Sequence, residues 1–590
     1  MLACIREKSA VRLEKISKSN SQLFSLPTGT GINGDTETPT IGQFQSDFID
    51  IIPEPWTAIS LALADDLNHL YITNYQAGQS PLVLRLPLTR QNVQDPDLED
   101  EKFDYMEAKS ELLRIIELSD ATVHRARDDA NALQAKGAKS RWWAEREELD
   151  QRLRDLLLNI ENMWLGGFRG MFSQHRRCPG LLARFQQSFE NILDKHLPSR
   201  QGSKKRSGRN KVALDLGIFE LFIGLGNAAD KDLDLDEALT DLLYFVVDIL
   251  QFNGEGNAYD EIDFDSIIVE TQDALHTYHD TAHLNTSDDV KQHTILILDK
   301  QLHAFPWESL PCLESLSVSR LSSLSELRDR VLTIRTQDSH TSVEPGFHIS
   351  SDKGTYILNP SGDLTKTQSR FQAPLASLST APSHDWTAII GRSPTETEFV
   401  TALSPPVSSS CPPNTIDSNT IDTRPSLLLY FGHGCGAQYI RSKTIKQTIP
   451  SCGVALLFGC SSASLKEVGE FEPYGTPRTY LTAGSPAVLG SLWDVTDMDC
   501  DRFAGAVLER WGLLQEGSFQ EDEGTKKGGK KAKMRVEMSD KKRAKDLKGR
   551  MKEKLCLSEA VARSRDDCYL KYLNGAAMVV YGVPVYLAAS

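Results

Sequence analysis

The stretch LLLYFGHGCGAQY at residues 427–439 joins an apolar run to a glycine-rich loop around a histidine, and VALLFGCSSA at residues 454–463 repeats this pattern around a cysteine. His433 and Cys460 each lie two places after a five-residue apolar run. Unalternated runs of this length are typical of strands buried on both faces, as in a parallel sheet. The segment between them is long enough for one crossover helix. The two side chains are therefore expected at the same edge of one sheet.

The same texture recurs through the second half of the chain. Apolar runs occur in TILILDK, TYILNP, WTAIIG and SPAVLGSLWD, at residues 294–300, 355–360, 386–391 and 485–494. The segments between these runs are long enough for helices. Residues 285–590 are therefore predicted to form an α/β domain, a parallel-rich sheet flanked by helices.

Residues 46–284 have a different, mixed α+β pattern. Three short β-rich runs between residues 56 and 88 predict a meander. A long antiparallel helical hairpin is predicted over residues 98–165, with a break at Gly137. Its second arm has apolar residues at spacings of four and three, the seam expected of packed helices. This seam comprises Leu149, Leu153, Leu156, Ile160 and Met163. We interpret the hairpin as scaffold, with a partner-binding arm as the alternative.

Composition sets limits on the class of protein. Of the chain's 590 residues, 40% are hydrophobic and 25% are charged, an ordinary composition for a globular protein. A chain of this length is too long for a single hydrophobic core, which indicates several domains. It contains neither an apolar stretch long enough to span a bilayer nor a secretory signal, so we expect a soluble, intracellular protein without membrane contact. The predicted localisation is the cytoplasm and nucleus. Ten cysteines without a CxxC pair indicate reduced thiols, and neither a metal nor a cofactor is expected.

Three segments have biased composition. Residues 1–45 are rich in Ser, Thr, Gly and Asn and are predicted to be a disordered tail or linker. The basic segment 198–211 is interpreted as a solvated loop, with a nuclear localisation signal as the alternative. The basic segment at about 515–554 is predicted to be a disordered insertion, with DNA contact as the alternative. The net charge of -16 argues against a surface that binds nucleic acid throughout.

A thiol beside an imidazole is suited to nucleophilic acyl transfer. Cysteine attacks as the thiolate, and a neighbouring histidine takes its proton and then protonates the leaving amine. The backbone N–H groups of Gly434 and Cys460 are candidates for an oxyanion hole, which glycine keeps accessible. Residues 461–463 are predicted to open a helix whose N-terminus favours a negative sulfur. Taken alone, His433 fits a turn and Cys460 a small core residue, and their matched offsets favour catalysis. Cys435 is a weaker candidate nucleophile.

These blocks resemble the histidine and cysteine blocks of separases, caspase-like cysteine endopeptidases. DKQLHAFPWESLPCL, RTYLTAGSPAVLGSLWDVTDMDCDRF and YLNGAAMVVYGVPVYL are also similar to the separase protease region, as are WTAISLALADDLNHLYITNYQAGQSPLVLRLPL and WLGGFRGMF in the first half. The resemblance, of the fungal type, covers most of residues 50–590. It implies a caspase-like protease domain over residues 285–590, preceded by a substrate-binding or pseudo-protease domain over residues 46–284.

The resemblance also implies roles and partners. His433 would be the general base and acid, Cys460 the nucleophile, and Gly434 with Cys460 the oxyanion hole. The implied reaction is cleavage after arginine in ExxR-like sites of the cohesin kleisin subunit, which releases sister chromatids at anaphase. Securin is the implied pseudosubstrate inhibitor.

An arginine substrate requires a carboxylate in its pocket. WDVTDMDCDRF supplies Asp494 and Asp501 after an apolar run. Asp501 is the first choice for this substrate-binding role, Asp494 comes from the same block, and Asp363 of NPSGD is a weaker second choice. An N-cap or turn role is the alternative for each.

The sequence departs from the separase pattern at Ala463, where separases usually have glycine. The long helical-repeat region typical of separases does not precede these blocks, so the chain resembles the carboxyl-terminal protease half. Two alternative functions are a catalytically silent scaffold with a caspase fold and a self-processing protease of metacaspase type. The intact His433 and Cys460 argue against the first, and the downstream separase-like blocks argue against the second.

Overall fold

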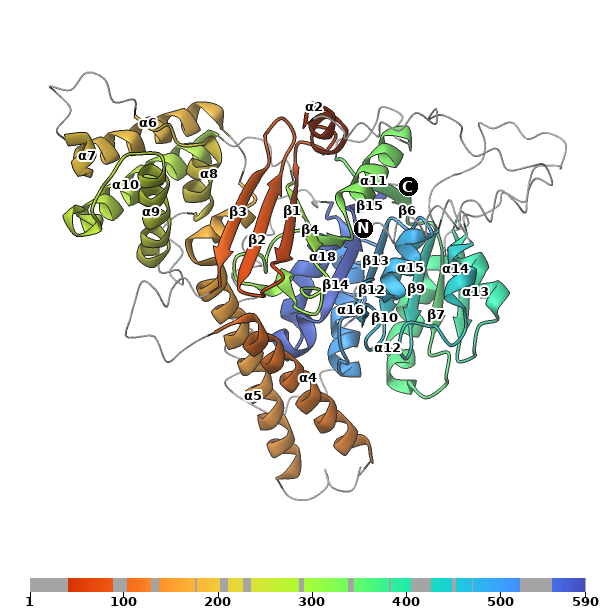
Figure 1. Ribbon diagram of the computed structural model, residues 1–590. Coiled ribbons are helices and arrows are strands. Elements are labelled where there is room, and N and C mark those ends of the chain that lie inside the picture. The colour runs from red at the N-terminus through yellow and green to blue at the C-terminus, as the bar shows by residue number, and fades with distance from the viewer. Residues whose placement is uncertain are drawn as a thin grey trace. The chain divides into compact units, whose positions relative to one another are not determined.

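The chain divides into two compact units with the boundary between Pro345 and Gly346 (Figure 1). We call them the N-terminal and C-terminal units. The predicted boundary lies at residues 284/285, and the substrate-binding and protease roles assigned to its two sides stay predictions. The computed structural model describes residues 41–88, 103–128, 137–175, 178–201, 211–226, 235–285, 291–337, 344–380, 384–404, 426–447, 452–469, 471–519 and 554–588.

The sheet of the N-terminal unit begins with the predicted meander. Strands β1 (Trp56–Leu63), β2 (His69–Tyr75) and β3 (Leu82–Pro87) pair antiparallel in this order. On its other side β1 pairs in parallel with β4 (His293–Leu298), which pairs in parallel with β5 (Val318–Leu321). All six residues of β4 are buried, as the unalternated run TILIL predicts.

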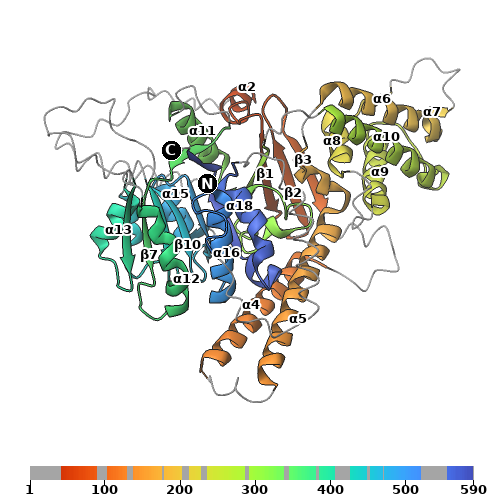
Figure 2. The same cartoon turned by 180° about the vertical axis from the view of Figure 1, so that it is seen from behind.

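The predicted helical hairpin is present. Helices α4 (Tyr105–Asp128) and α5 (Ala138–Asn159) lie side by side in both views (Figures 1 and 2), and α5 continues into η4 (Ile160–Leu165). Arg152 of α5 forms an ion pair with Glu111 of α4 at 2.6 Å. The seam residues Leu149, Leu153, Leu156 and Ile160 are buried, as predicted, and Met163 is half-buried. The apolar spacing therefore predicted a real packing face.

The remaining helices of this unit form a group after the hairpin. They are η5 (Gly166–Phe172), α6 (Pro179–His196), α7 (Pro198–Gln201), α8 (Leu216–Gly224), α9 (Leu235–Phe252), η7 (Tyr259–Glu261) and α10 (Phe264–Asn285). Shorter or separate elements are α2 (Ile41–Phe44), η1 (Gln45–Ile49), η8 (Trp307–Ser309) and α11 (Leu324–Gln337). Phe189 of α6 contacts Phe219 and Phe222 of α8 and is fully buried. The group has an aromatic core of its own.

Several biased segments lie largely outside the described residues. Residues 1–40 of the predicted tail, 202–210 of the basic loop and 520–553 of the basic insertion are among them. The predictions of disorder, nuclear targeting and DNA contact for these segments stay predictions. Residues 41–45 of the predicted tail lie in α2 and at the start of η1.

The C-terminal unit contains the predicted parallel-rich sheet. Its strand order is β14-β13-β10-β9-β7-β8. Strands β8 (Asp385–Ile390), β7 (Lys353–Leu358), β9 (Leu427–Phe431), β10 (Val454–Phe458) and β13 (Ala487–Ser491) are parallel. Strand β14 (Met578–Gly582) pairs antiparallel with β13. Two smaller pairs are β6 (Phe347–Ser350) with β15 (Val585–Ala588), and β11 (Leu465–Val468) with β12 (Phe471–Gly475).

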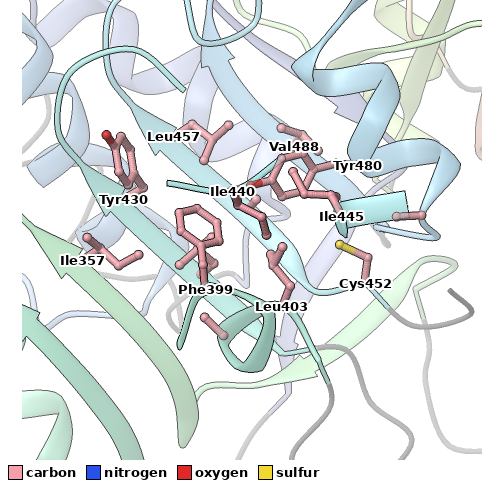
Figure 3. Packing of buried hydrophobic residues seen from close by; sticks show 14 of the residues in the cluster. Ile357, Phe399, Leu403, Tyr430, Ile440, Ile445, Cys452, Leu457, Tyr480 and Val488 are labelled. Carbon is pink, nitrogen blue, oxygen red and sulfur yellow. The ribbon is translucent and has the colours of Figure 1, made fainter. Parts of the chain in front are cut away.

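Helices lie on both faces of this sheet. Alternate residues of a strand point to opposite faces, so each strand packs against helices on both sides. Toward one face, Leu428 and Leu457 join a buried cluster with Phe399 of α13 (Glu396–Leu403) (Figure 3). This cluster also includes Ile445 of α14 (Ser442–Lys446) and Tyr480 of α15 (Thr476–Thr482). The strands are thus buried on this face, as their unalternated composition predicts.

Phe431 of β9 and Phe458 of β10 point to the opposite face. The Phe431 and Phe458 rings stack at 5.0 Å, and Phe431 lies 4.4 Å from Phe371 of α12 (Thr365–Ala376). Helices α12 and α16 (Asp497–Trp511) lie side by side in both views (Figures 1 and 2). The other elements are α18 (Leu557–Ser564), η9 (Ser377–Ser379), η11 (Arg565–Asp567) and η12 (Lys571–Gly575).

A buried ion pair in the N-terminal unit gives a test of the fold. Arg320 donates to both Glu308 carboxylate oxygens at 2.6 and 2.7 Å, and both residues are almost fully buried. Glu308→Ala leaves a buried guanidinium without its counter-ion and should lower the free energy of unfolding by about 3–5 kcal/mol. The Arg125–Glu145 pair is exposed, so Glu145→Ala should cost less than about 1 kcal/mol. Urea unfolding of both variants checks this, and equal losses would contradict it.

Candidate active site

The two reactive residues lie just beyond neighbouring parallel strands, as predicted. Strands β9 and β10 pair in parallel with Phe431 opposite Phe458. His433 and Cys460 each lie two residues beyond this pair. Helix α14 lies in the connection between the strands. Both side chains are half-buried and belong to loops that leave the same edge of the sheet.

The two loops are in direct backbone contact. A Cβ built on Gly459 would lie 2.4 Å from the Gly432 carbonyl oxygen and 2.2 Å from that of Gly434. Only glycine allows the chain before Cys460 to pass so close to the histidine loop. Gly434 itself has φ +62° and open space where a Cβ would stand. The use of the Gly434 and Cys460 N–H groups as an oxyanion hole stays a prediction.

The helix predicted immediately after the nucleophile is absent. Residues 461–463 instead form a turn that leads into β11. The sulfur is therefore not placed at a helix N-terminus. The Cys460 thiol donates to the Val495 carbonyl oxygen at 3.3 Å. This partner is a backbone atom, so residue identity gave no signal for it.

The turn carries backbone strain at the residue after the cysteine. Ser461 has φ +51°, a conformation that costs a residue with a Cβ roughly 1–2 kcal/mol. Its N–H donates to the Trp493 carbonyl oxygen at 3.2 Å, and its hydroxyl donates to Asp494 at 2.5 Å. Asp494 therefore holds the turn that follows Cys460. Its predicted contact with a substrate arginine stays a prediction.

The floor of the turn rests on the end of β13. The Ser491 hydroxyl donates to the Gly459 carbonyl oxygen at 2.9 Å, and the Ser491 carbonyl accepts from the Ala463 N–H at 2.8 Å. Ala463, the departure from the separase pattern, is fully buried. Its methyl group lies where a Cβ on Gly490 would come within 3.0 Å, so the glycine opposite makes room for it.

His433 has a carboxylate partner. Its Nε2 lies 2.7 Å from Asp363 Oδ2. The Tyr430 hydroxyl donates to the His433 carbonyl oxygen at 2.9 Å and fixes the backbone of the loop. The sequence suggested Asp363 as a substrate contact, which stays a prediction, and missed its contact with the histidine. The available signal was that NPSGD comes directly after β7, and β7 pairs with β9.

Asp501 lies on α16 next to α12. The Thr367 hydroxyl of α12 donates to its Oδ2 at 2.9 Å. Burial raises the pKa of Asp501 from 3.8 to about 7, although the Thr367 bond and the charge of Arg370 lower it in part. A carboxylate that loses this much hydration gains most from a cationic partner. Asp501 is thus suited to bind a guanidinium group.

Asp499, from the same acidic block, has a structural role. It is buried and accepts from the Tyr569 and Leu570 N–H groups and from the Asn574 amide, at 2.8 to 3.1 Å. These bonds tie the segment before β14 to α16. Neighbouring acids of one sequence block therefore have different partners.

The weaker candidate nucleophile has a packing role. Cys435 is half-buried and packs against the core cluster of Figure 3.

Among the described residues, no group of three or more His, Cys, Asp or Glu side chains could hold a metal ion. In the same part of the chain, no helix is both long and apolar enough to cross a bilayer.

Comparisons with known proteins place this geometry in a family. Residues 65–500 match the family described as "Separin, protease domain". The separin of Emericella nidulans is 43% identical over 582 residues, 99% of this chain and 25% of that protein. The separin of Schizosaccharomyces pombe is 37% identical over 576 residues, 97% of this chain and 27% of that protein. The chain spans about a quarter of the length of these curated relatives.

A solved structure agrees with these relatives. The crystal structure of the Saccharomyces cerevisiae separase–securin complex superposes with a TM-score of 0.72 at 31% identity. The match covers 92% of this chain and 31% of that one. The α/β fold with a parallel-rich sheet is therefore shared with a separase.

The contact between the two loops can be tested at Gly459. Gly459→Ala would force its methyl group into the Gly432 and Gly434 carbonyls, and such overpacking should lower the free energy of unfolding by about 1–3 kcal/mol. The matched control is Gly180→Ala, at an exposed position in α6 with open space around the added Cβ. The control should be neutral or slightly stabilising. Thermal unfolding compares the two, and an unaffected Gly459→Ala protein would show that the loops do not touch.

Proposed function

We propose, on the premise that this chain belongs to the separin protease-domain family, that it is a cysteine endopeptidase that cleaves after arginine in ExxR-like sites. One observation carries the proposal. The parallel pairing of β9 with β10 brings the His433 and Cys460 loops into contact at one edge of the sheet. A histidine beside a cysteine is the arrangement that nucleophilic acyl transfer requires.

The proposed chemistry uses these two side chains. His433 accepts the thiol proton, and the Cys460 thiolate attacks the carbonyl carbon of the scissile peptide. The Gly434 and Cys460 N–H groups stabilise the oxyanion of the tetrahedral intermediate. His433 then donates its proton to the leaving amine, and the C–N bond breaks to leave a thioester. Water, deprotonated by His433, attacks this thioester and releases the carboxylic acid together with the free thiol.

The preference for arginine rests on Asp501. A guanidinium group can donate two parallel hydrogen bonds to a carboxylate, and a lysine ammonium cannot reproduce this geometry. Burial removes water from the half-buried carboxylate of Asp501. Pairing with a guanidinium group replaces the hydrogen bonds that this water would have made. Its neighbour Thr367 orients the carboxylate through a 2.9 Å hydrogen bond.

The proposed substrate is the kleisin subunit of cohesin, with securin as a pseudosubstrate inhibitor in the same cleft. The solved separase that resembles this chain is a complex with securin, which supports the second partner. The proposed site of action is the cytoplasm and nucleus. DNA contact through the basic insertion at about 515–554 is a further part of the proposal, testable by salt-dependent binding with and without that segment.

The nucleophile is tested by cleavage of a fluorogenic ExxR peptide. Cys460→Ser should reduce kcat by a factor on the order of 10³ or more, because the hydroxyl is far less acidic than the thiol. Cys435→Ser is the matched control, since it removes the neighbouring thiol and should retain activity. A copy of the peptide with lysine in place of arginine should be cleaved poorly. Cleavage that survives Cys460→Ser, or absence of arginine-peptide cleavage, would refute the proposed function.

The arginine pocket is tested by the pH dependence. Because the pKa of Asp501 is about 7, the pocket is neutral below this pH and charged above it. The kcat/KM for the arginine peptide should rise as the pH increases through 7, and Asp501→Asn should remove this component and lower kcat/KM at pH 8. The pH dependence of kcat/KM that remains in Asp501→Asn then reports on His433 and Cys460 alone.

The same substitution should affect stability with the opposite sign. The pKa of Asp501 is higher in the folded chain than the ordinary 3.8, so folding favours the protonated form. The wild type therefore loses stability as the pH rises from 4 to above 7, by up to about 4 kcal/mol from this group. Asp501→Asn should gain stability relative to wild type at pH 8 but not at pH 4. Equal thermal shifts at the two pH values would contradict the pocket's desolvation.

A further inference from the structure

The carboxylate that contacts His433 stands on a turn with a defined hydrogen-bond network. Asn359 is buried and has φ +52°, and its N–H donates to the Phe431 carbonyl at the end of β9. Its side-chain oxygen accepts from the Leu364 N–H at 2.9 Å, and its amide donates to Gln368 at 2.8 Å. Asp363 lies between these anchored points. The turn therefore fixes the backbone on which the Asp363 carboxylate stands.

The strand order puts this carboxylate and the thiol on opposite sides of the histidine. The order in this part of the sheet is β10-β9-β7, all parallel. Cys460 comes after β10, His433 after β9, and Asp363 after β7. The three side chains therefore stand in sequence along one sheet edge, with the imidazole in the middle.

The contact distinguishes the two nitrogen atoms of the ring. Nε2 of His433 lies 2.7 Å from Asp363 Oδ2, so this nitrogen is the proton donor to the carboxylate. Nδ1 is then the atom free to exchange a proton with the thiol. A carboxylate on the far nitrogen also stabilises the imidazolium that forms when the thiol ionises.

We propose that Asp363 is a positioning residue that completes an Asp363–His433–Cys460 line, in which it fixes the ring orientation and tautomer and stabilises the imidazolium. This inference rests on the proposed function, because it assigns a residue to the same cysteine protease reaction. It differs from a substrate-binding role for Asp363. A residue on the histidine acts on kcat, whereas a contact with substrate arginine acts first on KM.

The exposure of the pair indicates where the effect appears. The side chains of His433 and Asp363 are 43% and 49% exposed. An ion pair so open to solvent contributes little to stability. Asp363 variants should therefore fold like the wild type and differ in reactivity.

The kinetic test uses Asp363→Ala and Asp363→Asn in the full chain with the fluorogenic ExxR peptide. Loss of the orienting carboxylate should lower kcat by roughly 10- to 100-fold, a part of what general acid–base catalysis contributes, with KM little changed. Asn retains an acceptor oxygen without the charge and should fall between wild type and Ala. Asp385→Asn is the matched control, because Asp385 is an exposed aspartate on β8 of the same unit.

A second measurement needs no substrate. The rate of Cys460 alkylation by iodoacetamide, measured by mass spectrometry, reports the thiolate population. Asp363→Asn should slow this alkylation several-fold at pH 6, well below the ordinary pKa of a cysteine thiol, and should match the wild type near pH 10. Asp385→Asn should behave as wild type throughout. A purely structural role for Asp363 would not produce this pH-dependent difference.

The outcomes separate this inference from the proposed function. Unchanged alkylation profiles, or a raised KM with unchanged kcat, would overturn the positioning role of Asp363. Cleavage that survives Cys460→Ser overturns the proposed function. The alkylation comparison needs no substrate, so it still tests the effect of Asp363 on the Cys460 thiol. The inference is supported by a fall in kcat together with alkylation that is slower at pH 6 but unchanged near pH 10.

Discussion

The parallel pairing of β9 with β10 is the constraint on which the site depends. Its register pairs Phe431 with Phe458, the last residues of the two strands. The residues that follow them, Gly432 and Gly459, therefore leave the sheet edge next to each other. The backbones of the two loops can touch only because Gly459 has no side chain to meet the Gly432 and Gly434 carbonyls. A shift of one residue would turn each strand over and exchange its two buried faces. The core on both sides of the sheet thus fixes the register, and the register fixes the histidine and cysteine loops.

The strained turn after Cys460 depends on the next strand in the sheet. Ser461 keeps a positive φ because Trp493 and Asp494, just beyond β13, bind its backbone and its hydroxyl. Strain of this kind persists only where surrounding contacts over-determine the conformation. The Val495 carbonyl then holds the thiol from the same loop. The conformation around Cys460 and the sheet topology are therefore coupled through a few hydrogen bonds.

Much of this arrangement could be predicted from sequence, and the reason is periodicity. Unalternated apolar runs predicted the strands, the spacing from Leu149 to Ile160 predicted the hairpin seam, and matched offsets predicted the positions of His433 and Cys460. The features that could not be predicted depend on strand order and backbone contacts. The Asp363–His433 contact requires β7 beside β9, which no local pattern specifies. The predicted helix after Cys460 is absent because the turn is held by hydrogen bonds from β13 and the loop after it, distant in sequence.

The acidic residues show why residue type alone does not assign a role. Asp499, Asp501 and Asp494 lie within one short block, yet each carboxylate meets a different environment. Asp499 is buried and satisfied by backbone N–H groups, so its charge holds two segments together. Asp494 is half-buried and accepts a hydrogen bond from the Ser461 hydroxyl. Asp501 is half-buried, and this burial raises its pKa although the Thr367 hydroxyl and the charge of Arg370 lower it in part. Burial and hydrogen-bond partners, rather than sequence position, therefore distinguish the environment of Asp501 from those of Asp494 and Asp499.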